Sequence, residues 1–205
     1  MGGMAPHSHD VDLAALESAS PLLSQVVASI DDHHWELATP CDAWDLAALV
    51  DHVTGGNWFT ILILNGQTAE EAMEQTMQLF DGRSATKQQA IAAVEGQLTA
   101  FRQPDVVHRR CHHVVGDLTG REVLRLRLHD LIVHTWDMSQ TLEPPASVPA
   151  GLLSWATAEL AGGESLTARN FEFAGLAALD AGDSEAAYLS WFGRSLSGAK
   201  HDGGQ

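Results

Sequence analysis

The sequence has few cysteines and no long apolar run. Its two cysteines, Cys41 and Cys111, are too few to staple a chain of 205 residues, and their separation excludes a CxxC metal or redox motif. This cysteine usage is typical of a reducing cytoplasm, where we expect the protein to be located. The longest apolar run, residues 58–64, is far shorter than the roughly 20 residues that span a bilayer, so we expect no membrane segment.

Basic residues are also scarce. The chain has 11 Lys and Arg against 27 Asp and Glu, which gives a formal net charge of −16. A nucleic-acid-binding protein needs a basic surface to displace counterions from phosphates, and an anionic membrane likewise attracts basic segments. We therefore expect neither nucleic acid nor membrane as a partner. With 45% hydrophobic and 19% charged residues, the composition is that of an ordinary globular protein.

The two ends of the chain differ from its middle. Residues 1–10 contain no Lys or Arg and no apolar segment, so they do not form a secretory signal and are expected to be a disordered tail. Residues 197–205 are rich in glycine and are expected to be a second disordered tail. The sequence thus predicts a single domain over residues 11–196, as a monomer or homodimer.

Apolar residues recur every three or four positions through most of the chain, which is the spacing of one buried helix face. The helices expected from this spacing are residues 11–35, about 43–64, 68–80, 86–101 and 121–142, with shorter helices at 148–161 and 184–192. The breaks between them carry turn or stop signals: Asn65-Gly66, Asp81-Gly82, Pro104, Pro144-Pro145 and Gly162-Gly163. Four substantial helices with little strand predict an all-α fold, namely an antiparallel four-helix bundle with extra short C-terminal helices.

Three local features refine this prediction. Asp42, followed three residues later by Asp45, predicts that the second helix has its N-cap at Asp42. Pro21 is expected to kink or delay the first helix. Residues 106–116 mix β-branched residues with histidines and are expected to be a loop or a short extended piece.

His52 stands in an otherwise apolar helix face. Leu49, Gly56 and Phe59 lie three residues before, four after and seven after it, so all four share one side of the helix. An imidazole in an apolar stripe costs free energy unless its nitrogens find partners, and Gly56 leaves room for a group to approach. His52 is therefore either a functional residue or a core histidine with an ordinary hydrogen bond.

Asp130 and His134 are spaced to act together. A separation of four residues places a carboxylate and an imidazole on adjacent turns of one helix face, near enough to bind one ion. Asp137 continues that face, and either Asp137 or a backbone carbonyl is expected to accept the second ring N–H of His134. The alternative is a solvated surface pair, but the surrounding helix is apolar on nearly every side: Leu124, Leu126, Leu128, Leu131, Ile132, Val133, Trp136 and Met138. A buried helix of this kind requires strong partners for its charged groups.

His129 is the alternative to Asp130 as an ion ligand. It lies about 100° around the helix from Asp130 and five residues from His134, which is a poor separation for sharing an ion. His112 and His113 stand next to Cys111, but adjacent side chains point apart, so we expect loop histidines there. The other histidines are expected at a helix end or in the tails: His33 and His34, and His7, His9 and His201.

Three stretches of the chain together resemble a known family. They are TPCDAWDLAALVDHVTGGN, LHDLIVHTWDMSQTL and DSEAAYLSWFGRS, in this order and spacing. They resemble the DinB-like (DinB/YfiT) metalloenzyme superfamily, and within it the actinobacterial branch that includes the N-terminal domain of mycothiol-dependent maleylpyruvate isomerase. The resemblance covers nearly the whole chain apart from the two tails.

The resemblance implies a four-helix bundle that holds a divalent metal ion, usually Zn²⁺ or Ni²⁺. Carried over residue by residue, its metal ligands fall on His52, Asp130 and His134. The middle ligand is usually Glu in the isomerase branch and His in other branches, so Asp130 is a shorter variant. Three such ligands leave a fourth coordination position open, which is the pattern of a catalytic zinc site.

The resemblance also implies what fills the open position. A low-molecular-weight thiol such as mycothiol would bind there as a thiolate and react with an electrophilic substrate, in a thiol transferase or a thiol-dependent isomerase. The isomerase itself has an additional C-terminal domain, whereas only residues 143–205 follow the second motif here, so we do not expect the specific isomerase activity. The alternatives are a non-catalytic metal-binding or stress-associated module, and a metal-water hydrolase with Asp137 as its base.

Overall fold

The structure is a computed structural model, in which the chain divides into two compact units, residues 1–146 and 147–205. The residues that it describes are 9–42, 44–80, 82–161, 165–167, 180 and 182–195. Most of them are helical, as the all-α prediction requires. Both expected tails lie largely outside the described residues, although the first helix already begins at His9.

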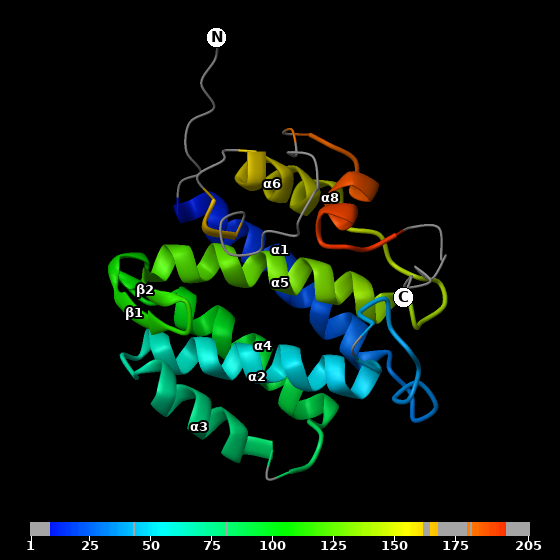
Figure 1. The fold of residues 1–205 in the computed structure, drawn as a ribbon, viewed down its shortest axis with the longest axis horizontal. Helices are drawn as coiled ribbons and strands as arrows, with labels where there is room; N and C mark the ends of the chain where they lie inside the picture. The colour runs from blue at the N-terminus through cyan, green and yellow to red at the C-terminus, as the bar shows by residue number, and fades with distance from the viewer. Residues whose placement is uncertain are drawn as a thin grey trace, which may run out of the picture. The chain divides into compact units, whose positions relative to one another are not determined.

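Four long helices of the first unit form the predicted bundle. They are α1 (His9–Ala28), α2 (Leu46–Leu64), α4 (Lys87–Phe101) and α5 (Gly120–Ser139). Both α1 and α2 pack against α4 and α5, so each helix has two neighbours within the bundle (Figure 1). Fully buried side chains from all four helices form the core: Leu16, Leu23, Leu49, Ile63, Phe101, Leu124, Leu128 and Leu131. Pro21 lies inside α1 without interrupting the helix.

The connections between the bundle helices contain additional structure. Helix α3 (Ala69–Phe80) packs against α2. A 3-10 turn, η1 (Val106–His108), precedes a hairpin in which β1 (Arg110–His113) pairs antiparallel with β2 (Gly116–Thr119). The short extended piece expected near residues 106–116 is thus one strand of a hairpin. At the start of α5 the chain passes so close to η1 that a Cβ on Gly120 would overlap the Val106 carbonyl oxygen, so only glycine fits there.

The prediction of the N-cap of the second helix is wrong by three residues. The cap is Asp45 rather than Asp42, and its side chain accepts a hydrogen bond from the backbone N–H of Ala48 at 2.8 Å. The reason is the turn that precedes it, in which the hydroxyl of Thr39 donates to the Trp44 carbonyl oxygen at 2.8 Å. This turn keeps the residues before Asp45 out of the helix.

Helix α2 is the most apolar of the bundle helices. Among the described residues it is the one helix whose length and composition would suffice to cross a membrane, with a mean hydropathy of 1.2 over an 18-residue window. Of that window, 56% is buried inside the protein. The core helix of a soluble bundle has the same properties, and α2 packs against α3, α4 and α5.

The second unit contains the short C-terminal helices that the sequence predicts, α6 (Ala150–Ala161) and α8 (Glu185–Trp191). The backbone N–H of Val148, just before α6, donates to the Glu185 carboxylate at 2.6 Å. The Thr157 hydroxyl accepts a hydrogen bond from the N–H of Gly182 at 3.1 Å. These two hydrogen bonds tie α6 and a residue just before it to the start of α8 and a residue just before that helix.

The two cysteines differ in accessibility, which predicts their reactivity. Neither forms a disulfide; Cys41 is partly exposed, whereas Cys111 is buried on β1. Burial raises the pKa of the Cys111 thiol, an effect that the nearby Arg109 only partly offsets. We expect iodoacetamide to modify Cys41 in the native protein and Cys111 only after denaturation, as read by peptide mass spectrometry. Equal labelling of both cysteines in the native state would contradict the buried position of Cys111.

Candidate metal centre

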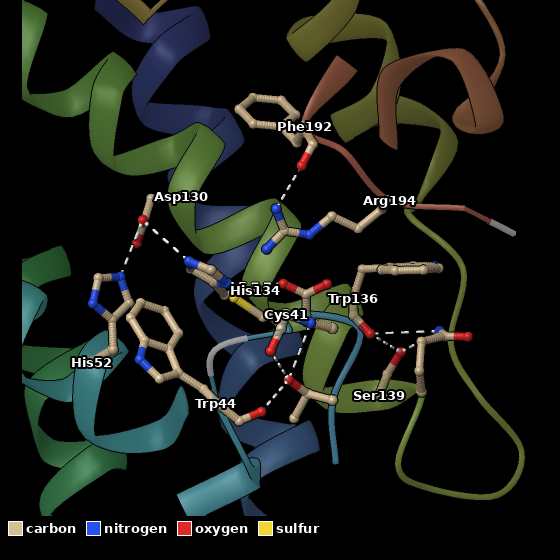
Figure 2. Close-up of polar contacts among 12 residues, drawn as sticks. Cys41, Trp44, His52, Asp130, His134, Trp136, Ser139, Phe192 and Arg194 are labelled. Atoms are coloured by element: carbon tan, nitrogen blue, oxygen red, sulfur yellow. Dashed lines mark hydrogen bonds and ion pairs between the residues drawn. The ribbon is translucent and has the colours of Figure 1, made fainter. Parts of the chain in front are cut away.

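The structure brings together the three side chains that the sequence singles out. The Nε2 atom of His52, on α2, lies 3.4 Å from Oδ1 of Asp130, on α5. The Nε2 atom of His134, one turn further along α5, lies 3.5 Å from the same oxygen. Each residue offers one ligand atom, and the three atoms lie within 4.8 Å of one another (Figure 2). The packing of α2 against α5 therefore brings residues that are far apart in the sequence into one cluster.

The ring of His134 is held between two carboxylates. Its Nδ1 lies 2.9 Å from Oδ2 of Asp137, which is fully buried, so the predicted hydrogen bond between them is present. Burial by itself lowers the pKa of His134, but Asp130 and Asp137 outweigh it and raise the pKa to about 9. The hydrogen bond at Nδ1 directs Nε2 toward Asp130. A metal ion at Nε2 would have to displace the proton held there.

Asp130 is ionised and its two oxygens face different partners. Burial raises its pKa, but the opposing charges of Arg127 and His134 hold the pKa well below its usual range. Oδ2 forms an ion pair with Nη1 of Arg127, one turn earlier on α5. Oδ1 faces both histidines. Asp130 is thus oriented to offer one oxygen to the space between the two imidazoles.

Arg127 is a member of the site that the sequence reasoning missed. Its side chain is 9% exposed and reaches from α5 across to α2, where Nη2 donates to the Val53 carbonyl oxygen at 2.8 Å. The group that approaches Gly56 is this guanidinium. A signal for it was available, because a charged residue one turn before Asp130 in a buried helix requires a carboxylate partner.

Trp44 is the second residue that the sequence did not indicate. It lies in the turn before α2, and its ring stacks on His52 with centroids 4.4 Å apart and planes 29° from parallel. Its centroid is 5.8 Å from that of His134. Trp44 thus forms an aromatic wall beside both imidazoles, while the side chains of His52 and Asp130 remain 36% and 29% exposed. A small molecule therefore has access to the cluster.

The residues present fit a divalent metal ion. Two imidazole nitrogens and one carboxylate oxygen are a common ligand set of catalytic zinc sites, and nickel also accepts imidazole and carboxylate. The carboxylate oxygen already faces both nitrogens, and the buried Asp137 fixes one of the rings. The cluster thus contains three metal-binding side chains and, in Asp137, the hydrogen-bond partner that orients one of them, as such sites need.

The other histidines that the structure describes lie outside the cluster. His129 is buried on α5 but does not belong to the cluster, so among the described residues Asp130 is the better placed neighbour. His112 lies on β1, and its Nδ1 is 2.6 Å from Oδ1 of Asp117 on β2. His113 packs its ring against Phe59, and burial together with the charge of Arg127 lowers its pKa. The hairpin histidines form no metal-binding group with Cys111 in the part of the chain that the structure describes.

A second group of possible ligands lies on the surface. Asp31, His33 and His34 follow α1, and Asp31 and His33 are exposed. The backbone N–H of Asp31 donates to Nδ1 of His34 at 2.8 Å, so these residues form a short turn at the helix end, where the sequence placed both histidines. Replacing His33 and His34 by alanine separates metal bound by this exposed group from metal bound by the cluster between α2 and α5.

Comparisons with known proteins support the fold and a family. The family model for the mycothiol maleylpyruvate isomerase N-terminal domain matches residues 16–139, a range that contains the whole candidate centre. The uncharacterized protein MT0763 of Mycobacterium tuberculosis strain CDC 1551 is 28% identical over 127 residues, which are 62% of this chain. The uncharacterized protein Rv0738 of strain H37Rv matches to the same extent. The match covers 65% of the length of these relatives.

Two solved structures have the same fold. The crystal structure of a histidine-to-alanine mutant of mycothiol-dependent maleylpyruvate isomerase gives a TM-score of 0.60 at 14% identity, over 76% of this chain and 70% of that one. The structure of the unmutated isomerase gives a TM-score of 0.57 with the same identity and coverage. At this identity the likeness shows the architecture of the bundle and nothing about substrate.

Proposed function

The chain belongs to the mycothiol maleylpyruvate isomerase N-terminal domain family, and we propose that it binds one divalent metal ion, Zn²⁺ or Ni²⁺, through His52, Asp130 and His134. The observation that carries this proposal is the convergence of their three ligand atoms within 4.8 Å. The hydrogen bond between His134 and Asp137 supports it, because it occupies Nδ1 and leaves Nε2 as the ring nitrogen that a metal ion can bind once it displaces the proton there.

The charges around the centre favour an anionic fourth ligand. When both histidines are neutral ligands, Arg127 offsets one of the two carboxylates, Asp130 and Asp137, and the group retains one negative charge. A divalent ion would bring it to one positive charge, which an anion such as a thiolate would neutralise. The ion when bound would supply a Lewis acid that lowers the pKa of a coordinated thiol.

We therefore propose a low-molecular-weight thiol such as mycothiol as cofactor and an electrophilic small molecule as substrate, in a thiol transferase or thiol-dependent isomerase reaction. His52, Asp130 and His134 would hold the ion, and the ion would supply the position at which the thiol sulfur binds. Trp44 would shield one side of it from water. In a transferase reaction the sulfur forms a bond to the electrophilic carbon, the bond from that carbon to its leaving group breaks with the electron pair going to the leaving group, and the thiol proton passes to solvent. In an isomerase reaction the sulfur adds to a conjugated double bond, whose π pair moves onto the attached carbonyl, and the sulfur leaves again after bond rotation, which regenerates the double bond and the thiol. We place the protein in the cytoplasm, where such thiols remain reduced.

A metal-water hydrolase is the less favoured alternative. Such an enzyme needs a general base beside the open coordination position, and the sequence suggested Asp137 for that role. In the structure Asp137 is fully buried behind His134 and is 2.9 Å from its Nδ1, so it is occupied in orienting the ring. A binding module without turnover would share the metal and thiol site and would differ only in lacking the reaction.

Calorimetry with thiols tests the proposal. Protein purified without a His tag is expected to contain close to one Zn²⁺ or Ni²⁺ per chain, and mycothiol is expected to give binding heat with the metal-loaded protein but not after chelator treatment. Glutathione, added in parallel, reports selectivity. Turnover of a chromogenic electrophile in the presence of thiol separates an enzyme from a binding module. Absence of metal would refute the proposed centre, and equal thiol binding by metal-free protein would refute thiol activation by the metal.

A further inference from the structure

We infer that Arg127 positions Asp130 as a metal ligand, and that residue 56 is glycine because the Arg127 guanidinium occupies the space of a side chain there. This inference rests on the metal centre proposed above. It assigns to Arg127 a role that differs from ligation, because the guanidinium acts on the metal site only through the carboxylate that it holds.

The guanidinium is fixed by groups from three helices. On α5, Nη1 pairs with Oδ2 of Asp130. On α2, Nη2 donates to the Val53 carbonyl oxygen at 2.8 Å and to Oδ1 of Asn57 at 3.1 Å. On α4, Nε lies 3.2 Å from Oε1 of Gln97. Both amide side chains are fully buried, so the guanidinium cannot move without breaking buried hydrogen bonds.

This arrangement determines how Asp130 faces the histidines. A free carboxylate can rotate and can offer either oxygen, or both, to a cation. Because Arg127 holds Oδ2, only Oδ1 is directed to the Nε2 atoms of His52 and His134. Asp130 would thus ligate through one oxygen in a fixed direction. Its short side chain leaves little freedom to recover that direction if the guanidinium is displaced.

The position of the Arg127 guanidinium depends most closely on the absence of a side chain at Gly56. A Cβ at residue 56 would lie 2.5 Å from Nη1, 2.8 Å from Cζ and 2.9 Å from Nη2 of Arg127, so alanine would force the guanidinium to shift. The preceding residue, Gly55, faces α3 instead. A Cβ there would lie 3.3 Å from Cγ2 of Thr76 and 3.7 Å from the ring of Phe80. The two glycines are neighbours on one helix, and replacing either by alanine raises helix propensity equally.

The pair Gly56→Ala and Gly55→Ala therefore tests the inference with a matched control. Both are made in a background with His33→Ala and His34→Ala, so that the exposed cluster contributes no metal binding. The probe is Co²⁺ alone, measured by its dissociation constant and by the absorption bands that report the geometry of its ligands. We expect Gly56→Ala to bind Co²⁺ at least about tenfold more weakly, with altered bands, because outer hydrogen-bond partners contribute about 10- to 100-fold to metal affinity. Gly55→Ala should match the parent.

A second variant covers the case in which Gly56→Ala does not fold. Arg127→Lys keeps the positive charge and loses the forked hydrogen bonds, so it should show the same weaker binding and altered bands. Parent-like affinity and bands in Gly56→Ala, or in Arg127→Lys if the first variant is unfolded, would overturn the inference. If the parent and Gly55→Ala bind no Co²⁺ at all, the proposed metal centre itself fails.

Discussion

Replacing His134 by alanine is expected to weaken Zn²⁺ binding by more than about 100-fold, because loss of a ligand costs more than the 10- to 100-fold lost with an outer hydrogen-bond partner. The change removes Nε2, one of the three atoms that converge within 4.8 Å. It also removes the ring that connects Asp130 to the buried Asp137. His52→Ala should have an effect of the same size. Competition with a chromogenic chelator measures both affinities.

His129→Ala is the matched control for these two variants. His129 is a buried histidine on the same helix, 1% exposed, but it does not belong to the cluster. Its replacement is expected to lower stability through lost packing, which a thermal melt of the metal-free protein reports, whereas Zn²⁺ affinity should stay at the parent value. A His129→Ala protein that loses its metal while Asp130→Ala retains it would show that the ligand set is wrong.

Most of the helices could be predicted from the sequence because their signals are local, but the first helix ends at Ala28, seven residues before its predicted end at residue 35. Spacing of three and four placed α3 and α4 within a residue or two of their observed bounds, and the stop at Asn65-Gly66 agrees with the end of α2. Helix starts and hairpins depend on interactions beyond one turn. The cap at Asp45 depends on a turn closed by Thr39, and strand β1 exists only because it pairs with residues 116–119.

In the candidate centre, too, the local contacts could be predicted from the sequence, whereas the contacts between helices could not. Spacing alone places Asp130 and His134 on one helix face and predicts the contact with Asp137. No spacing gives the distance between α2 and α5, so His52 was selected by its place in an apolar stripe and by family resemblance. Trp44 precedes its helix in a turn, and the stacking of its ring on His52 is a tertiary contact that the sequence does not encode locally.

Asp137→Asn is expected to weaken Zn²⁺ binding by about 10- to 100-fold while the protein remains folded. Asparagine has nearly the same size, but it is neutral and its amide is a weaker acceptor than a carboxylate for the Nδ1–H of His134. The ring would then be a poorer ligand, less firmly oriented. Chelator competition gives the affinity, and the imidazole NMR signals of the metal-free protein report whether the hydrogen bond at Nδ1 is lost.

Asp12→Asn distinguishes this effect from the general consequence of neutralising a buried acid. Asp12 is as fully buried as Asp137, but its Oδ2 accepts from Nε of Arg121 and Nε of Arg125, at 3.1 Å each, which ties α1 to α5 outside the cluster. Its replacement should lower the melting temperature and leave Zn²⁺ affinity unchanged. If both variants lost affinity equally, Asp137 would act on the metal only through fold stability; if Asp137→Asn lost none, its hydrogen bond to His134 would have no role in the centre.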